Sequence, residues 1–217
     1  MEKEYLNQER EQIIDFGLKM LSAGLTTGSG GNLSCFNRDL GLIAITPSGV
    51  EYPDLTPDGI IVMTPDGALC QGEGTPSSET GFHLALYHAR PDVNAVVHTH
   101  SPYATTFACL GREIPPVHYL VACAGKKVSV APYAIFGSME LAESIVSTLG
   151  DDNAVLMANH GLVAVGETLS RAFDTAGEIE LVARIYYQSL CIGTPVTLSD
   201  HQMDNVMEKF KTYRLPQ

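Results

Sequence analysis

The chain has 217 residues, 45% of them hydrophobic and 18% charged, which is typical of a globular protein with a sizeable buried core. It carries 13 Lys and Arg residues against 25 Asp and Glu residues, for a formal net charge of -12. Such an acidic balance argues against a broad surface for nucleic acid or for an anionic membrane, although backbone amides and hydroxyls could still hold one phosphate in a pocket.

The first part of the chain alternates between helical and strand patterns. Apolar residues at helical spacing predict a helix over residues 10–24. Short apolar runs predict strands over residues 42–46 and 59–63, with the triplets P-S-G and P-D-G as turns. Residues 77–91 predict a second helix, which begins near two serines and ends at a proline.

The second part continues this alternation. Its predicted elements are strands over residues 94–100 and 126–134, a helix over 138–150, two strands within 153–166 that meet at the turn N-H-G, and helices over 168–193 and 200–213. Interleaved helices and strands without a linker or repeat predict one α/β domain over residues 1–217, with a central sheet covered by helices. Apparent hairpins at P-D-G and N-H-G favour a mainly antiparallel or mixed sheet.

The five cysteines are widely spaced and form no C-x-x-C motif, a pattern typical of reduced, mostly buried thiols in the cytoplasm. The N-terminal stretch M-E-K-E-Y-L-N-Q-E-R-E-Q is charged and lacks the apolar core of a signal peptide. No apolar run approaches the ~18 residues that a membrane span requires. A cytoplasmic protein with neither a membrane nor a nucleic acid as partner is therefore expected.

Two histidines end the apolar stretch A-V-V-H-T-H-S at residues 95–101. Side chains two apart in an extended chain point the same way, so His98 and His100 face one point. Buried imidazoles without a partner are costly, and a bound cation would satisfy both. The pair therefore indicates a metal site, although a lone histidine is more often structural.

A metal site needs further ligands. His160 in A-N-H-G lies at a strand end beside a glycine, and Glu79 lies at a helix N-terminus, where the electropositive helix end favours a carboxylate. Glu79 could both ligate a metal and act as a base. The remaining histidines are candidates that spacing alone does not rank, and a structural role is favoured for each of them: His83, His88, His118 and His201.

Small polar residues cluster in three loops. The segment T-T-G-S-G-G-N-L-S, which contains Asn32, matches neither common glycine-rich phosphate motif, so by itself a flexible turn is favoured. The segments I-T-P-S-G and T-P-S-S-E add further hydroxyls, and Ser77 and Ser78 lie where a helix begins. Together the three clusters fit a phosphate site built from neutral donors.

An ordered set of short motifs resembles class II aldolases of the L-fuculose-1-phosphate aldolase family, a group that also includes L-ribulose-5-phosphate 4-epimerases. The motifs are G-G-N, T-P-S-G, P-S-S-E, H-T-H, V-H-Y-L, A-P-Y-A-I-F-G, N-H-G and K-F-K-T-Y. The resemblance extends from the first helix to Tyr213. It implies a central, mainly antiparallel sheet flanked by helices, in a homotetramer with sites between subunits. P-S-S-E and V-H-Y-L-V-A-C-A-G favour the aldolase side, since the epimerases typically carry P-S-S-D.

The resemblance also implies roles for particular residues. One zinc ion per subunit would be held by Glu79, His98, His100 and His160, with Glu79 doubling as acid and base. Five residues would bind the substrate phosphate: Asn32, Ser48, Gly49, Ser77 and Ser78. Three aromatic residues would complete the site: Tyr119, contributed from a neighbouring subunit, would protonate the aldehyde oxygen, Phe136 would line the aldehyde pocket, and Tyr213 would help to close the site.

The implied reaction is zinc-dependent cleavage of L-fuculose 1-phosphate to dihydroxyacetone phosphate and L-lactaldehyde or a similar small aldehyde. The segments G-L-T-T-G-S-G-G-N-L-S and H-T-H-S-P-Y-A also resemble aldolases for 5-deoxyribulose 1-phosphate or methylthioribulose 1-phosphate. Thr80, Gly81 and the segment A-G-K-K-V-S-V depart from the fuculose pattern, so the preferred aldehyde stays open. Three different functions also remain compatible with the sequence: an L-ribulose-5-phosphate 4-epimerase or dehydratase, a Schiff-base aldolase using Lys126 or Lys127, and a metal-stabilised non-catalytic binding protein.

Overall fold

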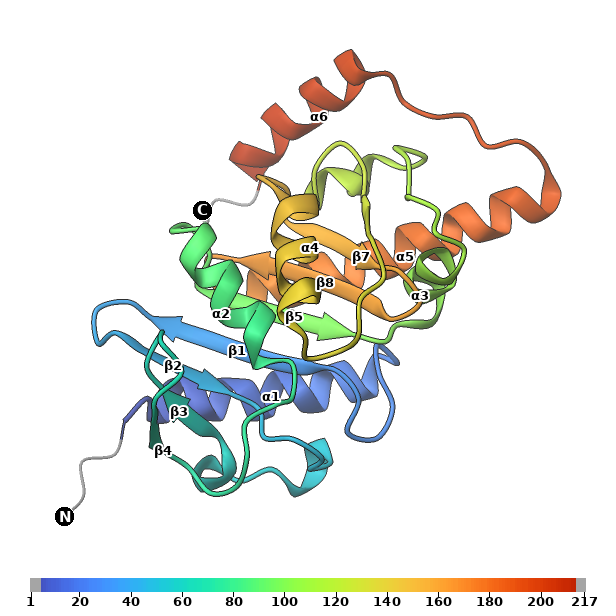
Figure 1. Cartoon of the computed structure of the whole chain (residues 1–217). Coiled ribbons are helices and arrows are strands. Elements are labelled where there is room, and N and C mark those ends of the chain that lie inside the picture. Colours follow the sequence, from blue (N-terminus) through green and yellow to red (C-terminus); the bar gives the residue numbers. More distant parts are fainter. Residues whose placement is uncertain (1–4, 214–217) are drawn as a thin grey trace.

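One eight-stranded sheet runs through the middle of the part of the chain that the computed structural model describes, residues 5–213 with side chains to residue 210 (Figure 1). Its strand order is β4-β3-β2-β1-β5-β8-β7-β6, and all neighbours are antiparallel except β6 and β7. The strands are β1 (Asn32–Asn37), β2 (Leu42–Ile45), β3 (Ile61–Met63), β4 (Leu69–Gln71), β5 (Ala95–Thr99), β6 (Val130–Ala131), β7 (Ala154–Met157) and β8 (Gly161–Gly166). The predicted mainly antiparallel sheet is confirmed.

Helices cover both faces of this sheet, and the described residues contain six of them. They are α1 (Asn7–Ser22), α2 (Thr80–Ala89), α3 (Pro102–Cys109), α4 (Met139–Leu149), α5 (Leu169–Ile192) and α6 (Asp200–Tyr213). Helices α2 and α4 pack on one face, and α1, α3 and α5 pack on the other. Helix α6 lies apart, against the short 3-10 helix η3 (Tyr119–Cys123), after an extended connection from α5 (Figure 1). The result is a three-layer, single-domain α/β fold.

Strand β5 shows how the two layers of core meet. Val97 packs into the cluster that contains Phe107 of α3, while Val96 packs into the cluster that contains Leu86 of α2. All residues of β5 are buried, because helices cover both sides of the strand. His98 follows these apolar residues and is itself fully buried, so a polar side chain is held inside the core.

Most of the predicted elements are present. The predicted helices correspond to α1, α2, α4, α5 and α6, and the hairpins at the second P-D-G triplet and at N-H-G connect β3 to β4 and β7 to β8. Strand β1, strand β4 and helix α3 are not predicted from the sequence. The flexible turn favoured for the glycine-rich segment is wrong after residue 31. Residues 32–37 form strand β1, which pairs with β2 on one side and with β5 on the other. The strand predicted over residues 126–134 is reduced to Val130–Ala131.

The prediction of mostly buried thiols is wrong. All five cysteines are free, but Cys70, Cys109 and Cys191 are exposed, and only Cys35 and Cys123 are buried. Within residues 5–213 the structure contains no helix whose length and apolar character would let it cross a membrane.

Candidate active site

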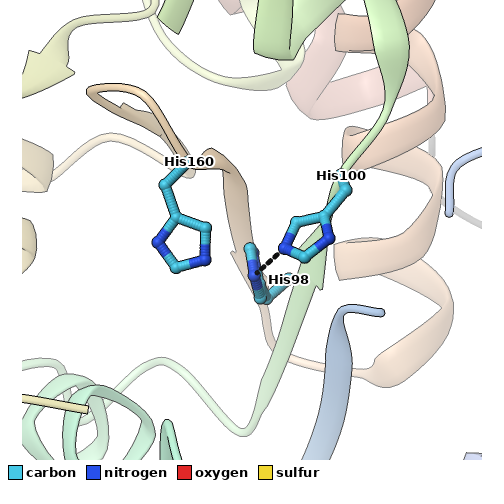
Figure 2. Close-up of side chains that lie close together, drawn as sticks. All are labelled: His98, His100 and His160. Carbon is cyan, nitrogen blue, oxygen red and sulfur yellow. Dashed lines mark hydrogen bonds between the residues drawn. The ribbon is translucent and has the colours of Figure 1, made fainter. Parts of the chain in front are cut away.

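Three histidines meet at one end of strands β5 and β8 (Figure 2). His98 is in β5, His100 follows that strand directly, and His160 lies in the turn between β7 and β8. Because β5 pairs with β8, the turn that carries His160 is brought beside the end of β5. The Nε2 atoms of His98 and His100 lie 3.1 Å apart, and one ligand atom from each histidine falls within 4.8 Å of the others. The convergence predicted for His98 and His100 is confirmed.

The turn before β8 has little room beside the histidines. A Cβ atom at Gly161 would collide with the carbonyl oxygen of Thr99 and would lie 3.1 Å from Cε1 of His98 and 3.2 Å from Cδ2 of His100. Asn159 has a φ of 56°, in the left-handed region that asparagine tolerates better than most residues. The sequence N-H-G therefore gives both the turn and the close approach that His160 needs.

His100 is held by the helix that follows it. The N-cap residue of α3, Ser101, makes no side-chain cap, and two backbone N–H groups of the first turn instead donate to the carboxylate of Glu180 in α5. The distances are 2.9 Å from Tyr103 and 2.8 Å from Ala104. An acceptor at this end satisfies donors that a helix leaves unpaired. Glu180 carries no signal in the sequence, because its two partners are 77 and 76 positions away in the chain.

Glu79 faces the histidines from the N-cap position of α2. Its Oε2 atom lies 3.2 Å from Nε2 of His98 and accepts a hydrogen bond of 2.8 Å from the Nδ2 group of Asn32. Its Oε1 atom lies 3.3 Å from Nε2 of His160 but has no hydrogen-bond partner among the described residues. A buried oxygen without a hydrogen bond is costly unless a further group binds it.

The donor set fits a metal ion. The Nδ1 group of His98 donates to the carbonyl oxygen of Leu162 at 3.0 Å, so a neutral His98 presents the lone pair of Nε2 to the other ligands. Nε2 of His100 lies next to Nε2 of His98. Without a cation, one of these two nitrogens must carry a proton to bond to the other. A bound cation would take the place of that proton. Three imidazole nitrogens with one carboxylate oxygen are ligands that suit zinc.

The protonation states also fit a cation. Burial alone would raise the pKa of Glu79, but His98, His160 and the Asn32 hydrogen bond outweigh burial and lower that pKa to about 2. Burial, followed by repulsion from His98, lowers the pKa of His100 to about 4, and burial chiefly lowers the pKa of His160. At neutral pH these groups are an ionised carboxylate and neutral imidazoles, which are the forms that bind a metal.

A cavity of about 360 Å³ opens beside the histidines. Glu79, His100 and His160 are among the residues that line it. All of the predicted phosphate-binding residues also line it: Asn32, Ser48, Gly49, Ser77 and Ser78. Phe136 is at the cavity as predicted, and Tyr133 and Asn159, which the sequence reasoning missed, lie there too. Both missed residues are neighbours of identified ones, in A-P-Y-A-I-F-G and N-H-G.

Comparison with known proteins identifies the family. Residues 11–187 match the family model described as Class II Aldolase and Adducin N-terminal domain. The chain belongs to the class II aldolase family. It is 50% identical over 208 residues to the 5-deoxy-D-ribulose 1-phosphate aldolase of Bacillus thuringiensis serovar kurstaki. The aligned residues cover 96% of this chain and 98% of that protein. It is 43% identical over 211 residues to the L-fuculose phosphate aldolase of Escherichia coli strain K12, and the aligned residues cover 96% of this chain and 97% of that protein.

A solved structure confirms the class II aldolase fold. An L-fuculose 1-phosphate aldolase superposes with a TM-score of 0.92 at 42% identity, over 94% of this chain and 96% of that chain. The chain is therefore an enzyme of the lyase class, and the hypothesis of a non-catalytic binding protein is wrong. Class II aldolases depend on a metal, and the three histidines form a group that could hold one.

One predicted aromatic residue of this aldolase, Tyr119, is not among the residues that line the cavity. Tyr119 is half exposed at the start of η3, where its ring lies 4.7 Å from that of His118 and 6.2 Å from that of Phe210. It is outside the set of residues that line the cavity within the described part of its own chain. Its role in a neighbouring subunit stays a prediction. The prediction for the side chain of Tyr213 lies outside the described residues.

The Schiff-base hypothesis is not supported by the surroundings of the two lysines. Lys126 pairs with Asp204 at 2.6 Å and Lys127 pairs with Glu113 at 2.7 Å, on the surface and away from the cavity lining. These hydrogen bonds raise the pKa of both lysines, whereas a Schiff-base lysine needs a lowered pKa.

The remaining histidines are outside the group of three. His88 bonds to the carbonyl oxygen of Pro65, His118 accepts from the backbone of Leu120, and His201 is exposed. His83 is fully buried and hydrogen-bonds to Asn32, which contacts Glu79. The structural role favoured for His88 and His118 agrees with these contacts, and that of His201 stays a prediction.

Proposed function

We propose that this class II aldolase cleaves a 1-phosphoketose between its third and fourth carbons, using one zinc ion, to give dihydroxyacetone phosphate and a small aldehyde. The convergence of His98, His100, His160 and Glu79 beside a cavity lined by serines and glycine carries the proposal. Two substrates are candidates. The 50% identical relative supports 5-deoxyribulose 1-phosphate, and the 43% identical relative supports L-fuculose 1-phosphate, the substrate first expected from the sequence.

The phosphate would be held by neutral groups. Ser77 and Ser78 precede the N-terminus of α2, and Ser48 and Gly49, in a segment bonded to the one before Ser77, line the same cavity. A helix N-terminus with neighbouring hydroxyls and amides stabilises a phosphate dianion without a basic side chain. This arrangement agrees with the acidic charge of the whole chain, since one anion can bind in a pocket of neutral donors.

The chemistry requires one proton to leave the hydroxyl oxygen of C4 and one proton to reach C3. The C3–C4 bond breaks, its electron pair stays on C3, the hydroxyl of C4 loses its proton, and C3 gains one. When bound, the zinc ion would supply Lewis-acid stabilisation of the negative charge that develops on the ketose half. Glu79 is ionised at neutral pH and presents the unpartnered Oε1, so it can accept a proton and then deliver it to C3, and we assign it this proton transfer. The proton that the C4 hydroxyl releases balances the one that C3 gains. Tyr119 of a neighbouring subunit in a homotetramer is proposed for the proton at the C4 oxygen.

A turnover screen with metal analysis tests this proposal. The protein is assayed for dihydroxyacetone phosphate release from 5-deoxyribulose 1-phosphate, L-fuculose 1-phosphate and ribulose 5-phosphate, before and after treatment with a chelator. We expect release from at least one 1-phosphate, loss of release with the metal, and recovery on adding zinc. Epimerisation of ribulose 5-phosphate without cleavage, or full activity without metal, would contradict the proposal.

A further inference from the structure

A chain of buried hydrogen bonds runs from Glu79 into the core. Asn32 donates from Nδ2 to Oε2 of Glu79 at 2.8 Å, and Oδ1 of Asn32 lies 2.6 Å from Nε2 of His83. The hydroxyl of Ser34 lies 2.7 Å from Nδ1 of His83 and 2.6 Å from the hydroxyl of Tyr87. All five side chains are more than nine-tenths buried. Buried polar side chains need hydrogen-bond partners, because a buried polar group without a partner costs free energy.

Two local periodicities bring the residues of this hydrogen-bond series together. Asn32 and Ser34 are two apart on β1, so they share a face of the strand. His83 and Tyr87 are four apart on α2, so they share a face of the helix. Because α2 packs against the sheet, the imidazole of His83 is placed between the two polar side chains of β1.

The ionised carboxylate sets the direction of every hydrogen bond. An ionised Glu79 only accepts, so Asn32 must turn its NH₂ group toward Glu79 and its carbonyl toward His83. That carbonyl only accepts, so His83 holds its proton on Nε2, and Nδ1 must accept from Ser34. Ser34 has one proton, so Tyr87 donates to it. Complete burial keeps the imidazole neutral, because it lowers the pKa of His83 to about 3.

We propose that His83 is a positioning residue: it acts through Asn32 to hold Glu79 in place. By holding the Asn32 carbonyl, it keeps the amide from turning over, so that the amide binds Oε2 and Oε1 remains available toward His160. An amide turned over would place its oxygen against the carboxylate, which would push Glu79 away from the ligand group. The proposal rests on the proposed function, because it concerns how Glu79 meets the metal.

Two variants of similar size separate this role from a structural one. The Nε2 group of glutamine can stand where Nε2 of histidine does, so His83→Gln keeps a donor for Asn32. The shorter side chain of His83→Asn can reach Ser34 but not Asn32. We expect His83→Asn to bind zinc roughly 10- to 100-fold more weakly, the range seen for partners that orient metal ligands. We expect the zinc affinity of His83→Gln to stay closer to that of the wild type. With cobalt(II) bound in place of zinc, we expect the absorption spectrum of the metal site to change in His83→Asn alone.

Leu86→Ala is the matched control, because Leu86 is fully buried on the same helix and packs in the apolar core. It should lower the melting temperature without weakening zinc binding. The proposal fails if the two His83 variants bind zinc equally, whether at wild-type strength or equally weakly, or if Leu86→Ala binds as weakly as His83→Asn. A wild-type protein that binds no zinc would instead contradict the proposed function.

A measurement on the unaltered protein provides a second test. Nitrogen-15 NMR of histidine-labelled, zinc-loaded protein reports which ring nitrogen carries the proton, and the His83 signals are assigned by their loss in His83→Gln. We expect a neutral ring with the proton on Nε2. A proton on Nδ1, or a doubly protonated ring at neutral pH, would overturn the proposal.

Discussion

The Nδ1 group of His98 donates a hydrogen bond to the carbonyl oxygen of Leu162, 3.0 Å away on the neighbouring strand. The two residues are joined by the β5–β8 ladder, in which Thr99 pairs with Leu162. Because a carbonyl oxygen only accepts, this contact places the proton of a neutral His98 on Nδ1 and leaves Nε2 for a metal. The pairing of two strands therefore orients a ligand of the proposed metal site.

Loss of His98 should remove the metal and nearly all turnover. In His98→Ala the remaining groups are too few to hold zinc tightly, so the loss should exceed the roughly 100-fold seen for partners that only orient ligands. Metal content after dialysis and the rate of dihydroxyacetone phosphate release measure this. His88→Ala, which alters an exposed histidine that bonds to a loop carbonyl, is the control and should keep its metal. Wild-type metal content in His98→Ala would exclude His98 as a ligand.

Replacing the proposed base by its neutral isostere should separate chemistry from folding. Glu79→Gln keeps the size of the side chain but removes the carboxylate, so turnover should fall by roughly 10²- to 10⁴-fold, the usual contribution of acid–base catalysis. The melting temperature should change little. Steady-state rates and thermal unfolding, measured on the same preparation, provide the comparison. Normal rates in this variant would refute the role of Glu79 in proton transfer.

Zinc binding should persist to unusually low pH for a histidine site. Protons compete with zinc for the imidazoles, and the pKa of His100 is lowered to about 4, with that of His160 also lowered. Lower pKa values move the competition at these two ligands to lower pH, so zinc affinity should fall at a lower pH than free imidazole ligands would allow, with protonation of His100 setting in as the pH approaches 4. Zinc titrations across this range measure it. A steep loss centred near pH 6.5 would show that the imidazoles titrate as in free histidine.

The glycine after His160 should tolerate no side chain. In Gly161→Ala the new Cβ would collide with the carbonyl oxygen of Thr99, and neither backbone can move without disturbing the β5–β8 ladder. We expect a loss of stability of about 1–3 kcal/mol, as for other overpacked sites, together with weaker zinc binding. Gly177→Ala in α5 is the control, since its Cβ would meet no atom within 4 Å. It should gain roughly 0.5–1 kcal/mol from the better helix former.

The two adjacent lysines should be dispensable for turnover. Lys126 is partly exposed and Lys127 is exposed, and both are paired with carboxylates that raise their pKa, so neither offers the uncharged amine that a Schiff base needs. The double variant Lys126→Ala, Lys127→Ala should keep near-normal rates, and borohydride with substrate should not inactivate the wild type. Inactivation by borohydride only in the presence of substrate would restore the Schiff-base hypothesis.

The sequence by itself determined the features that depend on near neighbours. The two-residue period of a strand showed that His98 and His100 point together, and helical spacing located five of the helices. These patterns arise because the side-chain direction follows from a few backbone angles. The set of motifs then indicated Glu79 and His160 as partners for the pair, and the structure brings all four together.

Only the tertiary structure decided the features that depend on distant segments. Residues 32–34 end the glycine-rich segment for which the sequence favours a turn, yet they begin a central strand, Asn32–Asn37, because β2 and β5 pair with it on either side. His83 could not be distinguished from three further histidines until packing placed it between Asn32 and Ser34. Hydrogen bonds between residues about 50 positions apart leave no local periodicity, since they form only when helices and sheet exclude water from between them.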